Sequence, residues 1–143
     1  MAENAGVSVA TCVLDTDVVI AALDRADAHH AAAVAAFERF TTRRTELVIC
    51  TVNYAEALVR PAEDERSLRA AVDAIASLGI RTSSPDAALA RVAARRRALG
   101  ISLADGFALA TAERVGADLA SFDQRVRRAL KSVDVRLSSA LTD

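Results

Sequence analysis

The stretch that decides the fold of this chain lies near its N-terminus, from Cys12 to Leu23, and reads CVLDTDVVIAAL. An apolar run stops at Asp15-Thr16-Asp17, and a second apolar run follows. We interpret the residues before Asp15 as a buried strand and those from Asp17 onward as the start of a helix. Carboxylates between apolar segments are costly to bury without a partner, so the two acids indicate a site.

The overall composition is that of an ordinary globular chain. The 143 residues are 52% hydrophobic and 26% charged, with a net charge of -1, so we expect a single domain over 1–143 with frayed residues at 1–8. This net charge excludes a protein that coats nucleic acid with an overall basic surface, but it is compatible with a local basic patch. No apolar run approaches a membrane span. Cys12 and Cys50 lie in apolar runs typical of buried thiols, so we expect a reduced, cytoplasmic protein with no membrane contact.

Short apolar runs alternate with helical patterns along the whole chain. We expect strands at 9–14, 47–50, 80–82, 118–120 and 133–137, and helices at 17–23, 29–40, 51–58, 63–78, 84–99, 103–115 and 123–130. Thr51 is expected to cap the helix that it opens. Alternating strands and helices are typical of a parallel sheet covered on both faces. We therefore predict an α/β fold, a three-layer α/β/α sandwich with a short parallel sheet of four to five strands.

Acids in mainly apolar surroundings recur where these strands end. They are Asp15 and Asp17 after the first strand, Glu56 in the helix after the second, Asp105 in the first turn of its helix, and Asp123 after the strand at 118–120. In open α/β sheets ligands bind at the carboxyl ends of the strands, so acids far apart in sequence can converge there. One such acid would be read as a helix cap, whereas four or five favour a site.

Carboxylates gathered in this way repel one another. At about 4 Å and an effective dielectric of about 20, each pair costs about 4 kcal/mol, which protonation or a bound cation relieves. A ligand set made only of oxygen favours a hard cation, Mg²⁺ or Mn²⁺. Such ions activate water and stabilise the leaving oxygen of a phosphodiester, so the pattern indicates phosphoryl chemistry.

Three segments resemble the PIN domain family and, more narrowly, the VapC toxins of bacterial toxin–antitoxin pairs. They read VLDTDVVIAAL, TVNYAEAL and GISLADGFALATAERVGADLASFDQR, and the resemblance covers about 11–137. It implies a Mg²⁺- or Mn²⁺-dependent endoribonuclease that cleaves tRNA or ribosomal RNA, is usually a homodimer, and is held inactive by a cognate VapB-like antitoxin. It also implies that the catalytic and metal-binding acids are Asp15, Glu56, Asp105 and Asp123.

Residues beside these acids extend the predicted site. Ser121 stands where family members often have a small polar residue, and Asp17 stands where they often have Ser or Asn, which makes Asp17 a candidate fifth ligand. Thr16 is expected to hydrogen-bond a site carboxylate. Many members carry another acid shortly after the last one, but Gln124 and Arg125 follow Asp123 here, so the number of metal ions stays open.

A basic cluster begins two residues after Asp123. Its members are Arg125, Arg127 and Arg128, which are candidate contacts for the RNA backbone, although placement near a helix C-terminus is the simpler explanation. Aromatic residues make up only 3% of the chain, so recognition is expected to rely on backbone and shape. His29 and His30 are interpreted as a solvated helix start.

Two other classes of function stay open on the sequence alone. The order Asp15-Thr16-Asp17-Val18 imitates the nucleophile motif of haloacid-dehalogenase-type phosphatases, with Asp15 as nucleophile. That family needs a Lys ahead of its final acidic pair, and the one Lys of this chain, Lys131, follows every site acid. The second alternative is a non-catalytic PIN-like module that keeps the fold and binds a partner.

Overall fold

A parallel sheet forms the centre of the molecule. A computed structural model describes residues 9–141, so the fraying expected at 1–8 lies outside the described residues. Within them the sheet has the order β3-β2-β1-β4 and consists of β1 (Thr11–Leu14), β2 (Glu46–Cys50), β3 (Ile80–Ser83) and β4 (Asp118–Ala120). All three strand pairings are parallel. The chain builds outward from β1 to β3 and then returns to the other side of β1, so the strand order reverses at the carboxyl ends of β1 and β4. In open α/β sheets this reversal is where ligands bind.

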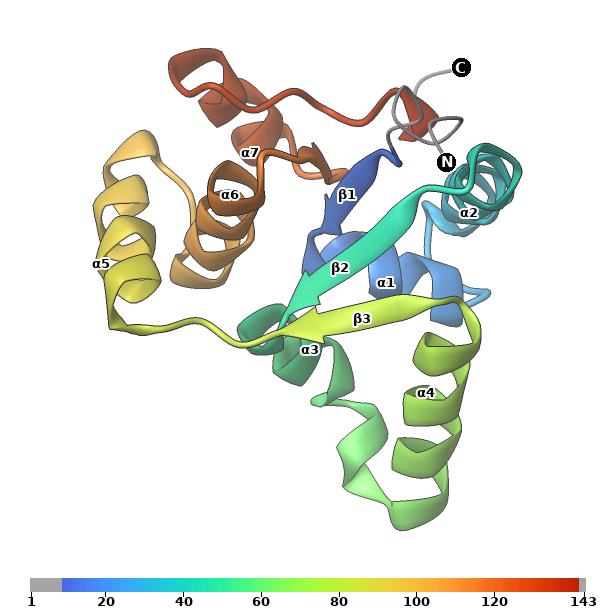
Figure 1. Cartoon of the computed structure of the whole chain (residues 1–143). Helices are drawn as coiled ribbons and strands as arrows, with labels where there is room; N and C mark the ends of the chain where they lie inside the picture. The colour runs from blue at the N-terminus through green and yellow to red at the C-terminus, as the bar shows by residue number, and fades with distance from the viewer. Residues whose placement is uncertain (1–8, 142–143) are drawn as a thin grey trace, which may run out of the picture.

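Helices cover both faces of this sheet. They are α1 (Thr16–Leu23), α2 (His30–Arg43), α3 (Thr51–Leu58), α4 (Glu65–Ser77), α5 (Ala87–Arg96), α6 (Leu103–Val115) and α7 (Gln124–Ala129), with 3-10 turns η2 (Pro61–Glu63), η3 (Arg97–Leu99), η4 (Leu130–Ser132) and η5 (Ser139–Leu141). Figure 1 shows α1 and α2 on one side of the strands and α5 and α6 on the other. The predicted three-layer α/β/α sandwich with a parallel sheet is confirmed. No helix of the described part of the chain has the length and apolarity to cross a membrane.

The two faces of the sheet carry separate hydrophobic clusters. Cys12 and Leu14 pack in one cluster with side chains of α1 and α2, whereas Val13 and Val48 pack in the other with α6 and α7. Successive strand residues point to opposite faces, so a strand covered on both sides is apolar throughout. Burial raises the pKa of the Cys12 thiol to about 12, which keeps it protonated and unreactive.

Several predicted element ends differ in the structure. Thr51 lies inside α3 and does not cap it, because Cys50 holds the N-cap position. Asp64 and Asp86 each accept a backbone N–H at the start of α4 and α5, so these helices begin later than predicted. A short carboxylate side chain one residue before a helix satisfies an orphan N–H, and this decides where the helix starts.

The fifth strand predicted at 133–137 is wrong. Leu137 forms a single isolated bridge with Leu119. The Leu119 N–H donates to the Arg136 carbonyl at 2.9 Å, and the Ser138 N–H donates to the Leu119 carbonyl at 2.8 Å. Because β4 is only three residues long, its outer edge provides backbone partners around one residue, which is too little for a strand.

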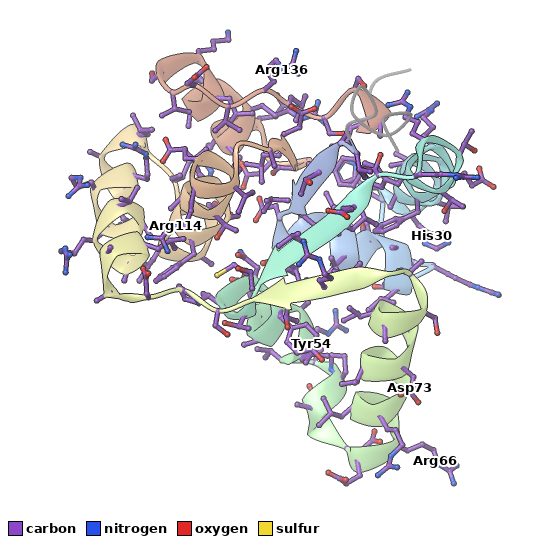
Figure 2. All side chains as sticks on the ribbon, viewed as in Figure 1. His30, Tyr54, Arg66, Asp73, Arg114 and Arg136 are labelled. Atoms are coloured by element: carbon purple, nitrogen blue, oxygen red, sulfur yellow. The ribbon has the colours of Figure 1, made fainter. Side chains whose placement is uncertain are left out.

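Close packing of α5 against α6 fixes the position of Asp105. A Cβ atom on Gly106 would lie 2.6 Å from the Ala93 carbonyl oxygen, so the absence of a side chain lets the two helices approach. The Arg114 guanidinium reaches from α6 to the Asp86 carboxylate at 2.9 Å (Figure 2). Gly106 in the first turn and Arg114 in the last turn thus hold α6 against α5, and Asp105 lies in that first turn.

Candidate functional site

Asp15 is a buried acid at the end of β1, with 1% of its surface exposed. Its N–H donates to the Ala120 carbonyl at 2.9 Å, which continues the pairing of β1 with β4. Its Oδ1 accepts the N–H of Thr16 at 2.9 Å, and its Oδ2 accepts the hydroxyl of Ser121 at 2.8 Å. The carboxylate is therefore fixed at the point where two neighbouring strands end.

Asp17 lies beside it, in the first turn of α1. Its Oδ2 accepts the N–H of Phe122 at 3.0 Å, directly after the residue that binds Asp15. Its Oδ1 is buried and has no hydrogen-bond partner. A buried carboxylate oxygen without a partner costs free energy, which a cation at this oxygen would recover.

The electrostatics of the two acids depend on two further aspartates. Burial raises the pKa of Asp15 well above its ordinary value, and the charges of Asp17 and Asp105 raise it further. Burial also raises the pKa of Asp17 to about 6; the Phe122 N–H opposes this shift, while Asp123 and Asp105 add to it. Charges from the starts of α6 and α7 thus act on the two acids at the start of α1.

Asp105 and Asp123 each help to cap a helix. Asp105 and Ser102 form a capping box, in which the Ser102 N–H donates to Asp105 Oδ2 at 3.3 Å. Asp123 Oδ1 accepts the Arg125 N–H at 2.7 Å. A carboxylate has about four acceptor positions, so one that accepts a single backbone N–H can still bind a metal ion.

Asn53 is a buried site residue that the sequence reasoning missed. Its Nδ2 donates to Thr16 Oγ1 at 3.1 Å and to the Ala104 carbonyl at 2.9 Å, so it joins α3 to α1 and α6. The Thr16 hydroxyl, expected to bond a carboxylate, therefore pairs with this amide instead. The signal in the sequence is a lone amide in the mainly apolar segment TVNYAEAL.

Glu56 is exposed and lines a groove between α1, α3 and α4. The groove has a volume of about 910 Å³, and its apolar wall consists of Ile20, Leu23, Ala57, Val59, Pro61, Ala70, Ala71 and Ala74. Glu56 is not among the charges named above as acting on Asp15 and Asp17. The charges of Asp17 and Asp105 thus act on Asp15, and those of Asp105 and Asp123 act on Asp17, whereas Glu56 lies on the groove wall.

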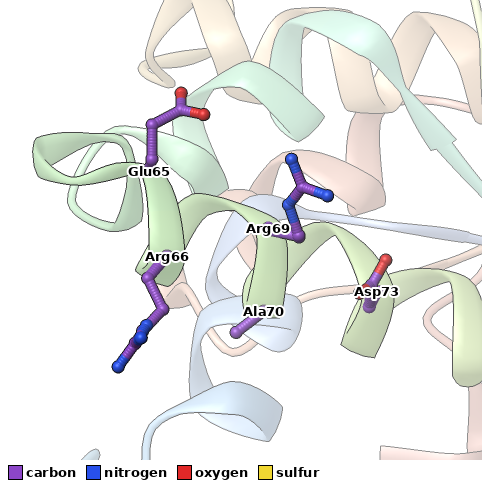
Figure 3. A pocket seen from close by; sticks show the side chains of 5 residues that line it. All are labelled: Glu65, Arg66, Arg69, Ala70 and Asp73. Atoms are coloured by element: carbon purple, nitrogen blue, oxygen red, sulfur yellow. The ribbon is translucent and has the colours of Figure 1, made fainter.

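A separate depression on α4 contains none of the predicted acids (Figure 3). Its lining residues are Glu65, Arg66, Arg69, Ala70 and Asp73. Acidic and basic side chains stand three or four positions apart along this one helix, a spacing that stabilises exposed helices. Figure 2 shows Arg66 and Asp73 on the outside of α4, so we interpret this depression as a solvated helix face.

The arginines after Asp123 divide into two kinds. Arg127 donates its Nε–H to the Ser121 carbonyl at 2.9 Å and so braces the end of β4. Arg125 has a side chain 66% exposed, with a guanidinium nitrogen 3.6 Å from Asp123 Oδ2, and Arg128 is also exposed. The two exposed side chains are accessible to a phosphate.

The histidine pair lies at the start of α2 with His29 exposed, as expected, and each imidazole also has a contact that the sequence did not indicate. The ring of His29 stacks on Phe122, with centroids 4.5 Å apart and an interplanar angle of 7°. His30, labelled in Figure 2, places Nδ1 2.7 Å from the Ala21 carbonyl. Phe122 offers its ring and Ala21 its backbone carbonyl, and folding brings each of these groups to one imidazole.

The donor set fits a hard, hydrated cation. All four aspartates offer carboxylate oxygens, and Oδ1 of Asp17, which has no hydrogen-bond partner, can bind a metal directly. Over residues 9–141 no three His, Cys, Asp or Glu side chains stand together as a complete metal-holding group. Mg²⁺ needs fewer than three protein ligands, because it is usually held by one or two carboxylates and keeps several waters.

The sequence matches one known protein family. The family model described as PIN domain matches residues 12–131. No curated protein matches the sequence.

Solved structures share the fold at low sequence identity. VapC20 of Mycobacterium tuberculosis, a Sarcin-Ricin loop cleaving toxin, is 18% identical with a TM-score of 0.64, over 80% of this chain and 92% of that one. VapBC2 of Rickettsia felis, solved bound to a DNA fragment from its promoter, is 14% identical with a TM-score of 0.68, over 90% and 97%. FitAcB of Neisseria gonorrhoeae is 19% identical with a TM-score of 0.67, over 92% and 99%.

Proposed function

The chain belongs to the PIN domain family, and on that premise we propose that it is a Mg²⁺- or Mn²⁺-dependent endoribonuclease that acts as the toxin of a toxin–antitoxin pair. One observation carries the proposal. Asp15 and Asp17 are fixed by Ser121 and Phe122 at the carboxyl ends of β1 and β4. Clustered carboxylates at a strand switch point suit the hydrolysis of RNA phosphodiester bonds.

The aspartates Asp15, Asp17, Asp105 and Asp123 would hold the metal. When bound, Mg²⁺ or Mn²⁺ supplies charge stabilisation to the phosphodiester and activates water. Asp15 has both oxygens hydrogen-bonded and therefore keeps one orientation. Asp17 Oδ1 is buried and has no hydrogen-bond partner, so it is the oxygen that would bind the metal directly.

Glu56 stays in the proposed catalytic set because the family resemblance assigns it there. It lies on the wall of the groove between α1, α3 and α4, three residues after Asn53 in α3. Asn53 itself contacts Thr16, the residue between the two buried acids, and so joins α3 to the start of α1. Glu56→Gln should therefore lower RNA cleavage if this exposed carboxylate acts in the reaction.

The phosphatase alternative is disfavoured by the surroundings of Asp15. A nucleophilic carboxylate must reach the substrate, but this one is 1% exposed and both of its oxygens accept hydrogen bonds. Attack on phosphorus from either oxygen would first require this buried carboxylate to become exposed to the substrate.

The first test compares substrates and metals. Purified protein is incubated with single-stranded RNA or p-nitrophenyl phosphate, in Mg²⁺, Mn²⁺ or EDTA. We expect RNA cleavage with either metal, none in EDTA, and no release of nitrophenol. Asp105→Asn should abolish cleavage, whereas Asp73→Asn on the outer face of α4 should not. Release of nitrophenol would favour the phosphatase, and no reaction at all would favour the non-catalytic module.

The proposed partners are a cognate VapB-like antitoxin and a second copy of the chain. Support comes from the apolar wall of the groove beside Glu56, including Ile20, Leu23 and Val59, which an antitoxin segment could cover. Expression of the chain alone should arrest growth in the cytoplasm, where we propose it acts. Normal growth at full expression would count against the toxin, and a monomer at high concentration would count against the homodimer.

The proposed substrate class is tRNA or ribosomal RNA, with Arg125 and Arg128 as contacts to its backbone. Both side chains are exposed beside Asp123, and each phosphate contact adds to the salt dependence of binding. Changing both to Ala should weaken binding uniformly across RNA sequences and flatten its dependence on salt. Unchanged binding would leave them as surface charges.

A further inference from the structure

The stacked pair His29 and Phe122 forms a small aromatic platform at the surface. Phe122 has 9% of its surface exposed, and the imidazole covers it in a nearly parallel arrangement. His29 itself is exposed. Since one face of its ring lies on Phe122, the opposite face is open to solvent.

This platform lies directly beside the acidic site. Phe122 stands between Ser121, which binds Asp15, and Asp123, and its own N–H binds Asp17. The charge of His29 acts on Asp17 as well, since it is one of the influences that lower the pKa of that acid. A group seated on the imidazole would therefore be next to a phosphodiester held at the aspartates.

The backbone of His29 is fixed at the start of α2. The backbone N–H of His29 donates to Asp27 Oδ1 at 2.8 Å, and its backbone carbonyl accepts the N–H of Ala33 at 2.9 Å. The neighbouring His30 is used differently, because its Nδ1 faces the Ala21 carbonyl. The two adjacent histidines thus provide a test residue and a matched control.

Other aromatic rings of the described chain are occupied in packing. Phe37, Phe40 and Tyr54 belong to the hydrophobic cluster on one face of the sheet, and Phe107 packs against the cluster between α5 and α6. Bases of single-stranded RNA are bound by stacking on aromatic side chains, histidine included. The scarcity of aromatic residues therefore makes the position of this one pair beside the acids informative.

We propose that the open face of His29, supported by Phe122, stacks one nucleobase of the RNA next to the cleaved bond. The inference rests on the proposed ribonuclease function and deepens it, because it selects single-stranded RNA with an unpaired base at that position. Stacking holds a base without reading its hydrogen-bonding edge, so it fixes the position of the strand more than its sequence.

The experiment measures binding of a short single-stranded RNA that the wild type cleaves, in Mn²⁺ and in an Asp105→Asn background. His29→Ala should weaken binding about tenfold, the loss expected for one base stack. His29→Phe should restore it, and His30→Ala should leave it unchanged. A 2-aminopurine placed beside the cleaved bond should be quenched on binding, and this quenching should disappear in His29→Ala and return in His29→Phe.

Each contrary result has its own meaning. Unchanged affinity and quenching in His29→Ala would overturn the platform while leaving the nuclease intact. Restoration by His29→Lys but not by His29→Phe would also overturn it, because the charge and not the ring would then be responsible. If the wild type neither binds nor cleaves RNA, the proposed function fails and the platform fails with it. Thermal melts of all variants exclude loss of folding as the cause.

Discussion

The hydroxyl of Ser121 donates a 2.8 Å hydrogen bond to Oδ2 of Asp15, a residue 106 positions earlier in the chain. Because β1 and β4 are parallel neighbours, their carboxyl ends meet and make this contact possible. A hydrogen bond to the charged form of an acid favours that form. The bond accordingly lowers the pKa of Asp15 against the larger effect of burial, and Ser121 is a positioning residue for the proposed site.

Ser121→Ala tests this relationship. Without the hydroxyl, the pKa of Asp15 should rise further, so less of this acid is ionised at neutral pH and RNA cleavage there should fall. The pH at which cleavage reaches half its maximum should move upward, which a merely structural role would not produce. Ser84→Ala, in the exposed segment before α5, is the control, and an equal pH profile in both variants would contradict the role of Ser121.

Asp17→Asn should change how metal-free stability depends on pH. The folded pKa of Asp17 is raised to about 6, so its stabilising contribution is fully present below the unfolded value of about 3.9 and is lost as pH rises through about 6. A shift of about two units corresponds to about 3 kcal/mol of unfolding free energy. Urea titrations in EDTA should show the variant gaining on the wild type between pH 4 and 7, and parallel curves would contradict the raised pKa.

Metal should stabilise the wild type, and Asp105→Asn should reduce that effect. A cation at about 100 times its dissociation constant adds about 2.7 kcal/mol if it binds only the folded chain. The variant loses one ligand and one repelling charge, so its stability in EDTA should be level or higher and its Mn²⁺-induced rise in Tm smaller. Thermal melts of both proteins decide the matter, and an equal shift in both would remove Asp105 from the ligand set.

Gly106→Ala should destabilise the fold through backbone contact. Its Cβ would lie 2.6 Å from the Ala93 carbonyl oxygen, and overpacking of this kind costs about 1–3 kcal/mol. Adding Ala93→Gly should not rescue the variant, because the obstructing atom is a carbonyl oxygen that glycine also carries. Urea unfolding measures the effect. Full rescue by the second change would show that side chains, and not the backbone, set the helix spacing.

The sequence indicated which acids belong to the candidate site but not how each is held. Asp15, Asp105 and Asp123 stand out locally because each interrupts or opens an apolar segment after a predicted element. The partner of Asp17 is a backbone N–H at Phe122, and every residue has such a group, so no pattern marks it. Asn53 went unnoticed because one amide in a helix gives no sign of burial until α1 and α6 pack around it.

The amino-acid sequence by itself determined the alternation of strands and helices, since apolar runs and helix-ending glycines act within a few residues. It could not decide whether 133–137 joins the sheet, because that depends on how much edge the three residues of β4 offer. Only the tertiary structure placed His29 on Phe122 and turned Glu56 toward the groove. Such contacts depend on which elements become neighbours in space, and that is fixed by the strand order and helix packing of the whole chain.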